Sequence, residues 1–153
     1  MLTIEKKSLK VGKYVSTQHV DEVVRNYKQE RWIQNSERIG QEDSLSGWWS
    51  IEEMEEFLEN AKMNGADGVR MYFGAYSKNY AEKPEYAGKQ TLVMVATEQK
   101  ETAQGDVVDK DIYINNGNKM DILAYNMIRL SPKASSEIGI TLIDKGEKGM
   151  VVI

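Results

Sequence analysis

Two neighbouring stretches with strand patterns constrain the fold of this chain more than any other part of the sequence. The first, Gly68–Tyr76, alternates apolar and polar side chains with the period of two that is typical of a strand with one face on a core. Its apolar residues are Val69, Met71 and Phe73, and Arg70 and Tyr72 lie between them. The second, Thr91–Thr97, is apolar at nearly every position, as in a central strand covered on both faces. The polar segment 77–90 predicts a long connection, so we expect an antiparallel pair.

Two helices are predicted before this pair of strands. Ser16 or Thr17 is a suitable N-cap for a helix that runs to about Arg38. The sequence Ser50-Ile-Glu-Glu53 is a capping box, and it predicts a second helix that ends at Asn64–Gly65. We therefore expect an α+β fold, with two N-terminal helices packed on one face of a mainly antiparallel sheet.

The remaining segments give weaker patterns. Residues 10–14 are compatible with a short edge strand, residues 98–105 with a loop, and residues 107–114 with a further strand. Residues 120–130 fit the period of a helix and that of a strand, so both alternatives stay open. Residues 138–143 and 149–153 flank a polar turn with Gly146, which predicts a terminal hairpin.

Length and charge narrow the class of protein. The 153 residues suit one domain, spanning residues 1–153. A net charge of −4 argues against general nucleic-acid binding, which needs a basic surface. The start of the chain has no apolar signal-peptide core, and no apolar run reaches the roughly 18 residues that a membrane span needs. We expect a cytoplasmic protein without membrane contact.

The residue types exclude several chemistries. The chain has no cysteine, which rules out thiol catalysis and thiolate metal sites. Its one histidine, His19, lies in the first turn of a predicted helix, and there is no nucleophile elbow or phosphate-binding glycine loop. The acidic run at Asp106, Asp109 and Asp111 lacks the glycine and the terminal glutamate of a calcium loop. We therefore predict no catalytic residue, no metal site and no cofactor, and an enzyme is the less favoured reading.

One arrangement supports a ligand-site hypothesis. Arg70 and Tyr72 share the face of their strand opposite to the apolar residues, and Arg70 is able to bind a carboxylate or phosphate with two hydrogen bonds. Trp48 and Trp49 precede the second helix and complete the predicted ligand-binding set. The alternative is that Arg70 pairs with a glutamate and Tyr72 packs under a helix.

Two functions remain open from these residues. The first is a non-enzymatic interaction module that associates with itself or with another protein. Its basis is a surplus of aromatic residues in polar segments, a kind of residue enriched at contact surfaces. These residues are Trp32, Trp48, Trp49, Tyr76, Tyr80 and Tyr86. The second is a small anionic-ligand-binding protein or enzyme that uses Arg70 and Tyr72.

The two strands also carry a resemblance. Gly68-Val-Arg-Met-Tyr-Phe-Gly74 and Thr91-Leu-Val-Met-Val95, following a helix, resemble a group of small Bacteroidetes-type bacterial proteins for which no activity is established. The resemblance covers residues 51 to about 131 and implies a mixed fold and a bacterial source. Members of that group often end in a Cys-Pro-Pro-x-Cys-like motif. Leu130-Ser-Pro132 matches its position without the cysteines, so a role of that end does not transfer.

Overall fold

The computed structural model describes residues 10–132, 142–144 and 150–152 of the chain, the last two ranges by their backbone only. The chain divides into two compact units. Among the described residues, unit 1 contains residues 10–12, 49–73 and 92–128. Unit 2 contains residues 13–48, 74–91, 129–132, 142–144 and 150–152. The prediction of a single domain stays a prediction.

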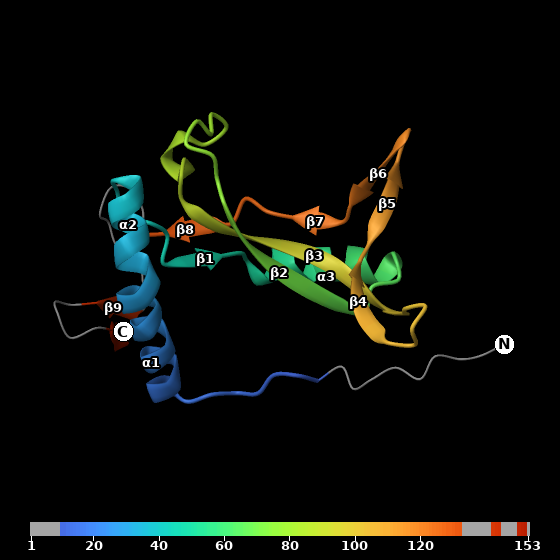
Figure 1. Ribbon diagram of the computed structural model, residues 1–153, viewed down its shortest axis with the longest axis horizontal. Helices are drawn as coiled ribbons and strands as arrows, with labels where there is room; N and C mark the ends of the chain where they lie inside the picture. The colour runs from blue at the N-terminus through green and yellow to red at the C-terminus, as the bar shows by residue number, and fades with distance from the viewer. Residues whose placement is uncertain (1–9, 133–141, 145–149, 153) are drawn as a thin grey trace. The chain divides into compact units, whose positions relative to one another are not determined.

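Unit 2 begins with a helical run of three parts (Figure 1). These are α1 (Thr17–Tyr27), the π-helical turn η1 (Lys28–Trp32) and α2 (Ile33–Ile39). The Ser16 hydroxyl accepts a hydrogen bond from the His19 amide and caps α1, as predicted. Gly40, with a φ of 74°, ends α2 in the left-handed conformation that glycine adopts without strain. The predicted helix of residues 17–38 is therefore confirmed, with a π-turn in its middle.

The rest of unit 2 consists of short strands and a loop. Antiparallel pairs join β1 (Ser46–Trp48) to β8 (Arg129–Ser131), and β9 (Leu142–Asp144) to β10 (Met150–Val152). The second pair agrees with the predicted terminal hairpin, whose turn at Gly146 lies outside the described residues. The polar connection contains the 3-10 turn η2 (Pro84–Tyr86), in agreement with the predicted loop.

Unit 1 contains α3 (Ile51–Met63), which has both bonds of the predicted capping box. The Ser50 hydroxyl accepts from the Glu53 amide, and the Glu53 carboxylate accepts from the Ser50 amide, each at 3.0 Å. Phe57 and Ala61 of α3 are buried. The ring of Phe57 lies 6.0 Å from that of Tyr125, and the Tyr125 hydroxyl donates to Glu53 at 2.9 Å.

The main sheet has the strand order β2-β3-β4, and β7 also pairs with β3 (Figure 1). The strands are β2 (Gly68–Ala75), β3 (Gln90–Glu101), β4 (Val107–Asp111) and β7 (Ala124–Tyr125). A separate antiparallel hairpin joins β5 (Tyr113–Asn116) to β6 (Lys119–Ile122). Both β2 and β3 cross the division between the units. Residues 68–73 of β2 and 92–101 of β3 belong to unit 1, and the remaining residues of each strand belong to unit 2.

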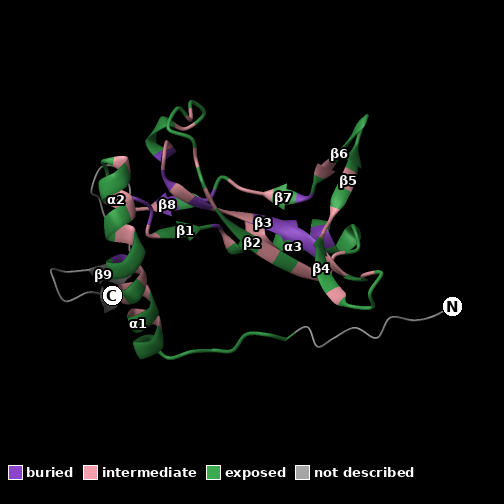
Figure 2. Cartoon of the chain, viewed as in Figure 1, coloured by how far each residue is buried: buried purple, intermediate pink, exposed green. Residues whose placement is uncertain are grey.

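The centre of unit 1 is β3. Met94, Val95, Ala96 and Thr97 are each at most 3% exposed. Because successive strand residues point to opposite faces, four such residues in a row require cover on both faces of β3. The prediction of a central strand at Thr91–Thr97 is confirmed, and Figure 2 shows β3 as the buried strand of the sheet.

The predicted burial of the apolar residues of β2 is wrong. Val69, Met71 and Phe73 were expected to face a core, but they are 36%, 46% and 81% exposed. The reason lies in the position of α3. Phe57 of α3 packs against Tyr125, and Tyr125 pairs with Met94 of β3, so the helix covers β3 and β7 and leaves β2 open.

Three smaller predictions are also corrected. Residues 98–101 continue β3 instead of forming a loop, and residues 10–14 form no strand. Residues 120–130, for which helix and strand stayed open, contain β6, β7 and β8 and no helix. The fold is a mixed α and β fold, and every strand pair with a defined register is antiparallel. The packing of two N-terminal helices on one sheet stays a prediction.

Candidate functional site

The structure brings Arg70 and Tyr72 together around the carboxylate of Asp111. Arg70 Nη1 donates to Asp111 Oδ1 and the Tyr72 hydroxyl donates to Asp111 Oδ2, both at 2.5 Å. Arg70 Nη2 also donates to the backbone oxygen of Asp109 at 2.7 Å. Arg70 and Tyr72 come from β2 and the two aspartates from β4, so these bonds pass over β3.

The charge of Arg70 is matched within the protein. The side chain of Tyr72 and, after it, the charge of Asp111 raise the pKa of Arg70 above its ordinary value, so the guanidinium remains charged. Since the Arg70 side chain is 37% exposed, the ion pair contributes only about 0–1 kcal/mol to stability. An external anion would have to compete with Asp111 for the same donors. The proposed role of Arg70 in anion binding stays a prediction.

Sequence reasoning missed Asp111 as the partner. It compared Asp106, Asp109 and Asp111 only with the calcium-loop pattern, which they do not match. Their spacing of two residues in β4 places both on one face of that strand. This alternation is a signal in the sequence, but it becomes useful only once β4 is known to share a sheet with β2.

The two predicted tryptophans have separate environments. Trp48 belongs to unit 2, where the guanidinium of Arg129 lies 4.1 Å from its ring centroid. Trp49 belongs to unit 1 and is buried, with its ring 6.1 Å from that of Tyr125 and its Nε1 donating to Asn126 O at 3.4 Å. No contact described for Trp49 includes Arg70 or Tyr72. The structure therefore assigns Trp49 to the core of unit 1.

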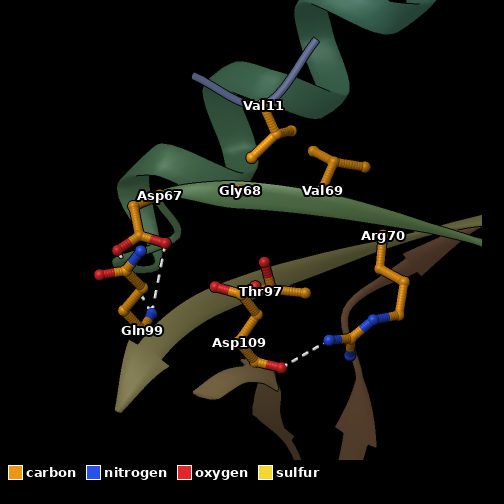
Figure 3. Close-up of a pocket in the computed structure, with 8 residues that line it drawn as sticks. All are labelled: Val11, Asp67, Gly68, Val69, Arg70, Thr97, Gln99 and Asp109. Atoms are coloured by element: carbon orange, nitrogen blue, oxygen red, sulfur yellow. Dashed lines mark hydrogen bonds between the residues drawn. The ribbon is translucent and has the colours of Figure 1, made fainter. Parts of the chain in front are cut away.

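A pocket of about 340 Å³ lies in unit 1 beside Arg70 (Figure 3). Its walls include the carboxylates of Asp67 and Asp109 as well as Thr97 and Gln99. Two carboxylates line this pocket, and its one guanidinium, that of Arg70, is already bound by Asp111. Such a lining is unfavourable for a phosphate or carboxylate. The pocket therefore gives the anionic-ligand hypothesis no support.

The aromatic residues predicted as contact surfaces make contacts inside unit 2. Trp32 Nε1 donates to Asp43 O at 2.8 Å. The rings of Tyr76 and Tyr80 stack at 4.5 Å, and those of Tyr76 and Tyr86 at 5.9 Å. Each ring thus has a neighbour within its own unit, so these residues do not mark a contact surface on their own.

The β2 apolar face, formed by Val69, Met71 and Phe73, is the exposed feature of unit 1 that the sequence placed in the core. Figure 3 shows the Val69 side chain and the Arg70 side chain on opposite sides of β2. The face is a row of apolar side chains on a strand at the end of the described β2-β3-β4 order. Such a row on an edge strand is typical of a contact surface.

Within the described residues, no three acidic or histidine side chains come together as metal ligands. His19 is exposed, and its backbone amide caps α1 by donating to Ser16. In the part of the chain that the structure describes, no helix combines the length and the apolar content of a membrane span. Comparison of the chain with protein-family models, with curated proteins and with solved structures gave no match.

Proposed function

We propose that this protein is a non-enzymatic interaction module that associates with itself through the β2 apolar face. The observation that supports this proposal is the exposure of Val69, Met71 and Phe73 on a strand at the end of the sheet. An edge strand offers unpaired backbone N–H and C=O groups, which form a template for a further strand. Adding a strand there would satisfy these groups and bury the apolar row.

The two ends of the β2-β3-β4 order differ in charge, and the difference favours β2 as the contact strand. At the other end, β4 has the sequence Val-Val-Asp-Lys-Asp, in which three of five residues are charged. Charged residues on an edge discourage pairing with another chain. The eight residues of β2 include one charged residue, Arg70, and its guanidinium is bound by Asp111. Of the two end strands in the described β2-β3-β4 order, β2 is therefore the one that lacks the usual protection of an edge.

Light scattering over a range of concentrations tests the proposal. We expect a parent protein that associates as its concentration rises, and a Phe73→Lys variant that stays monomeric, because the lysine charge would be buried in the contact. Met120→Lys is the matched control, because Met120 is also an exposed methionine on a strand, 60% exposed, but lies on β6. A monomeric parent at high concentration, or equal loss of association in both variants, would rule out the β2 apolar face.

Other parts of the functional assignment belong to the same proposal. We place the protein in the cytoplasm of a bacterium, with a second copy of the chain as the first partner to test and no nucleic acid or membrane as a partner. We also retain the packing of two N-terminal helices on one sheet as an inference about the fold. The negative net charge of −4 supports the exclusion of nucleic acid.

A further inference from the structure

The backbone of β2 determines which residues a partner strand would meet. A Cβ atom placed on Gly68 would lie 2.8 Å from Thr97 Oγ1, and one placed on Gly74 would lie 3.7 Å from Thr91 Cγ2. These two close approaches are six residues apart on both strands, so the β2–β3 ladder has no inserted residue between them.

The same ladder fixes the direction of the backbone groups. The Tyr76 amide donates to Lys89 O at 3.0 Å, so in an antiparallel ladder the even-numbered residues of β2 bond to β3. The odd-numbered residues Val69, Met71 and Phe73 then direct their N–H and C=O groups to the outer edge. These are the residues whose side chains form the β2 apolar face. The residues that offer backbone bonds and the residues that offer apolar surface are therefore the same three.

We propose that β2 pairs antiparallel with β2 of a second copy, with Met71 of each copy opposite Met71 of the other. This inference rests on the proposed self-association and specifies its geometry. The pairing has two-fold symmetry, and each copy contributes the same surface. It would join the two β2-β3-β4 sheets into one continuous sheet.

The side chains of β2 favour this register. With Met71 on the symmetry axis, Val69 lies opposite Phe73 of the second copy, and all three apolar residues meet apolar residues. Arg70 then lies opposite Tyr72 of the second copy, and in each copy Asp111 on β4 binds both side chains, so the Arg70 charge is matched within its own copy. Within one copy Arg70 already lies over its own Tyr72, 5.9 Å from the ring centroid.

Other registers are less favourable. An axis at Arg70 would place two guanidinium groups directly opposite each other, and a parallel in-register pairing would place them side by side. An axis at Tyr72 would place Val69 opposite Ala75 of the second copy, so the three residues of the β2 apolar face would no longer meet only one another. The Met71-centred pairing is the antiparallel arrangement in which Val69, Met71 and Phe73 meet only one another and the two Arg70 residues are not opposed.

Single cysteines test this geometry on a chain that has none of its own. Opposed residues of a hydrogen-bonded pair have Cα atoms about 5.5 Å apart, within the range that a disulfide spans. Met71→Cys should therefore give covalent dimers under mild oxidation. Val69→Cys alone and Phe73→Cys alone should stay monomeric on a denaturing gel, because the two equivalent positions are then about 14 Å apart along the strands. An equimolar mixture of these two variants should cross-link.

Controls separate this inference from the proposed function. Each reduced variant is first tested for association by light scattering, and Met120→Cys reports random cross-linking. Cross-linking of Tyr72→Cys with a silent Met71→Cys would overturn the register while leaving self-association intact. Association without any β2 cross-link would mean that the copies meet through another surface, or that another segment, such as the N-terminal one, pairs with β2 in place of the second β2. Either reading would overturn the β2–β2 pairing. Absence of association in every variant and in the parent would overturn both proposals.

Discussion

Replacing Phe73 with alanine should weaken self-association strongly and leave the fold of each copy almost unchanged. Phe73 is 81% exposed, so it contributes little to the core of one copy. Complete burial of a large apolar side chain is worth about 1.5–3 kcal/mol, so burying the exposed four-fifths of this ring is worth about 2 kcal/mol per copy. Two copies bury two rings, so Phe73→Ala should lower the free energy of association by about 4 kcal/mol per dimer. This loss corresponds to a roughly 10³-fold larger dissociation constant.

Sedimentation equilibrium over a dilution series measures this dissociation constant for the parent and for Phe73→Ala. Unfolding in urea, at concentrations where both proteins are monomeric, measures the stability of one copy. We expect the free energy of unfolding to change by no more than about 0.5 kcal/mol, as for other surface positions. The matched control is Phe57→Ala, which truncates the other phenylalanine of the chain, 5% exposed. It should lower the stability of each copy by about 3–5 kcal/mol.

The opposite pattern would refute the reasoning. If Phe73→Ala lowered the free energy of unfolding of the monomer by more than about 2 kcal/mol and left the dissociation constant unchanged, Phe73 would belong to a core and not to an interface. The exposure of the β2 apolar face would then be incorrect, and the edge-pairing geometry would lose its basis.

Three further predictions concern the fold of unit 1. Ser50→Ala removes the N-cap of α3 and should lower stability by about 1 kcal/mol, seen as a lower urea midpoint. Gly68→Ala places a Cβ atom 2.8 Å from the buried Thr97 hydroxyl and should lower the free energy of unfolding by about 1–3 kcal/mol. Adding Thr97→Ala should recover part of this loss, and additive losses in the double variant would contradict the clash. The hydrogen bond to Glu53 raises the pKa of Tyr125 above 10.0. The protonated Tyr125 hydroxyl therefore stabilises the folded protein fully below pH 10.0, and this contribution is lost as the pH rises through the raised pKa. Tyr125→Phe should flatten that alkaline decline in urea unfolding at several pH values, and an unchanged decline would assign it to other groups.

Local signals predicted the individual elements well. The capping box at Ser50 and Glu53 involves residues three apart, so its two bonds depend on no distant part of the chain. The apolar run of Thr91–Thr97 also specifies its own environment, because a strand without a polar face needs cover on both sides. These elements could be predicted because the necessary information lies within a few consecutive residues.

The exposure of β2 could not be predicted in the same way. Alternation in residues 69–73 shows that the two faces of the strand differ, but it does not show how far a helix covers the apolar face. That depends on where α3 lies, and α3 is positioned by Phe57 against Tyr125, two residues that are far apart in the sequence. The partner of Arg70 was missed for the same reason, since Asp111 is 41 residues away.

The Arg70 cluster and the β2 apolar face belong to one arrangement. Arg70 is the only charged residue of β2, and a free guanidinium there would protect the edge by repelling a second copy. Asp111 binds that guanidinium on the side of the sheet opposite to Val69, Met71 and Phe73, and Tyr72 binds the same carboxylate. The cluster therefore balances the one charge that opposes pairing. Under the proposed pairing, the residues that first suggested an anion site would support a contact strand, because their hydrogen bonds are directed to one another.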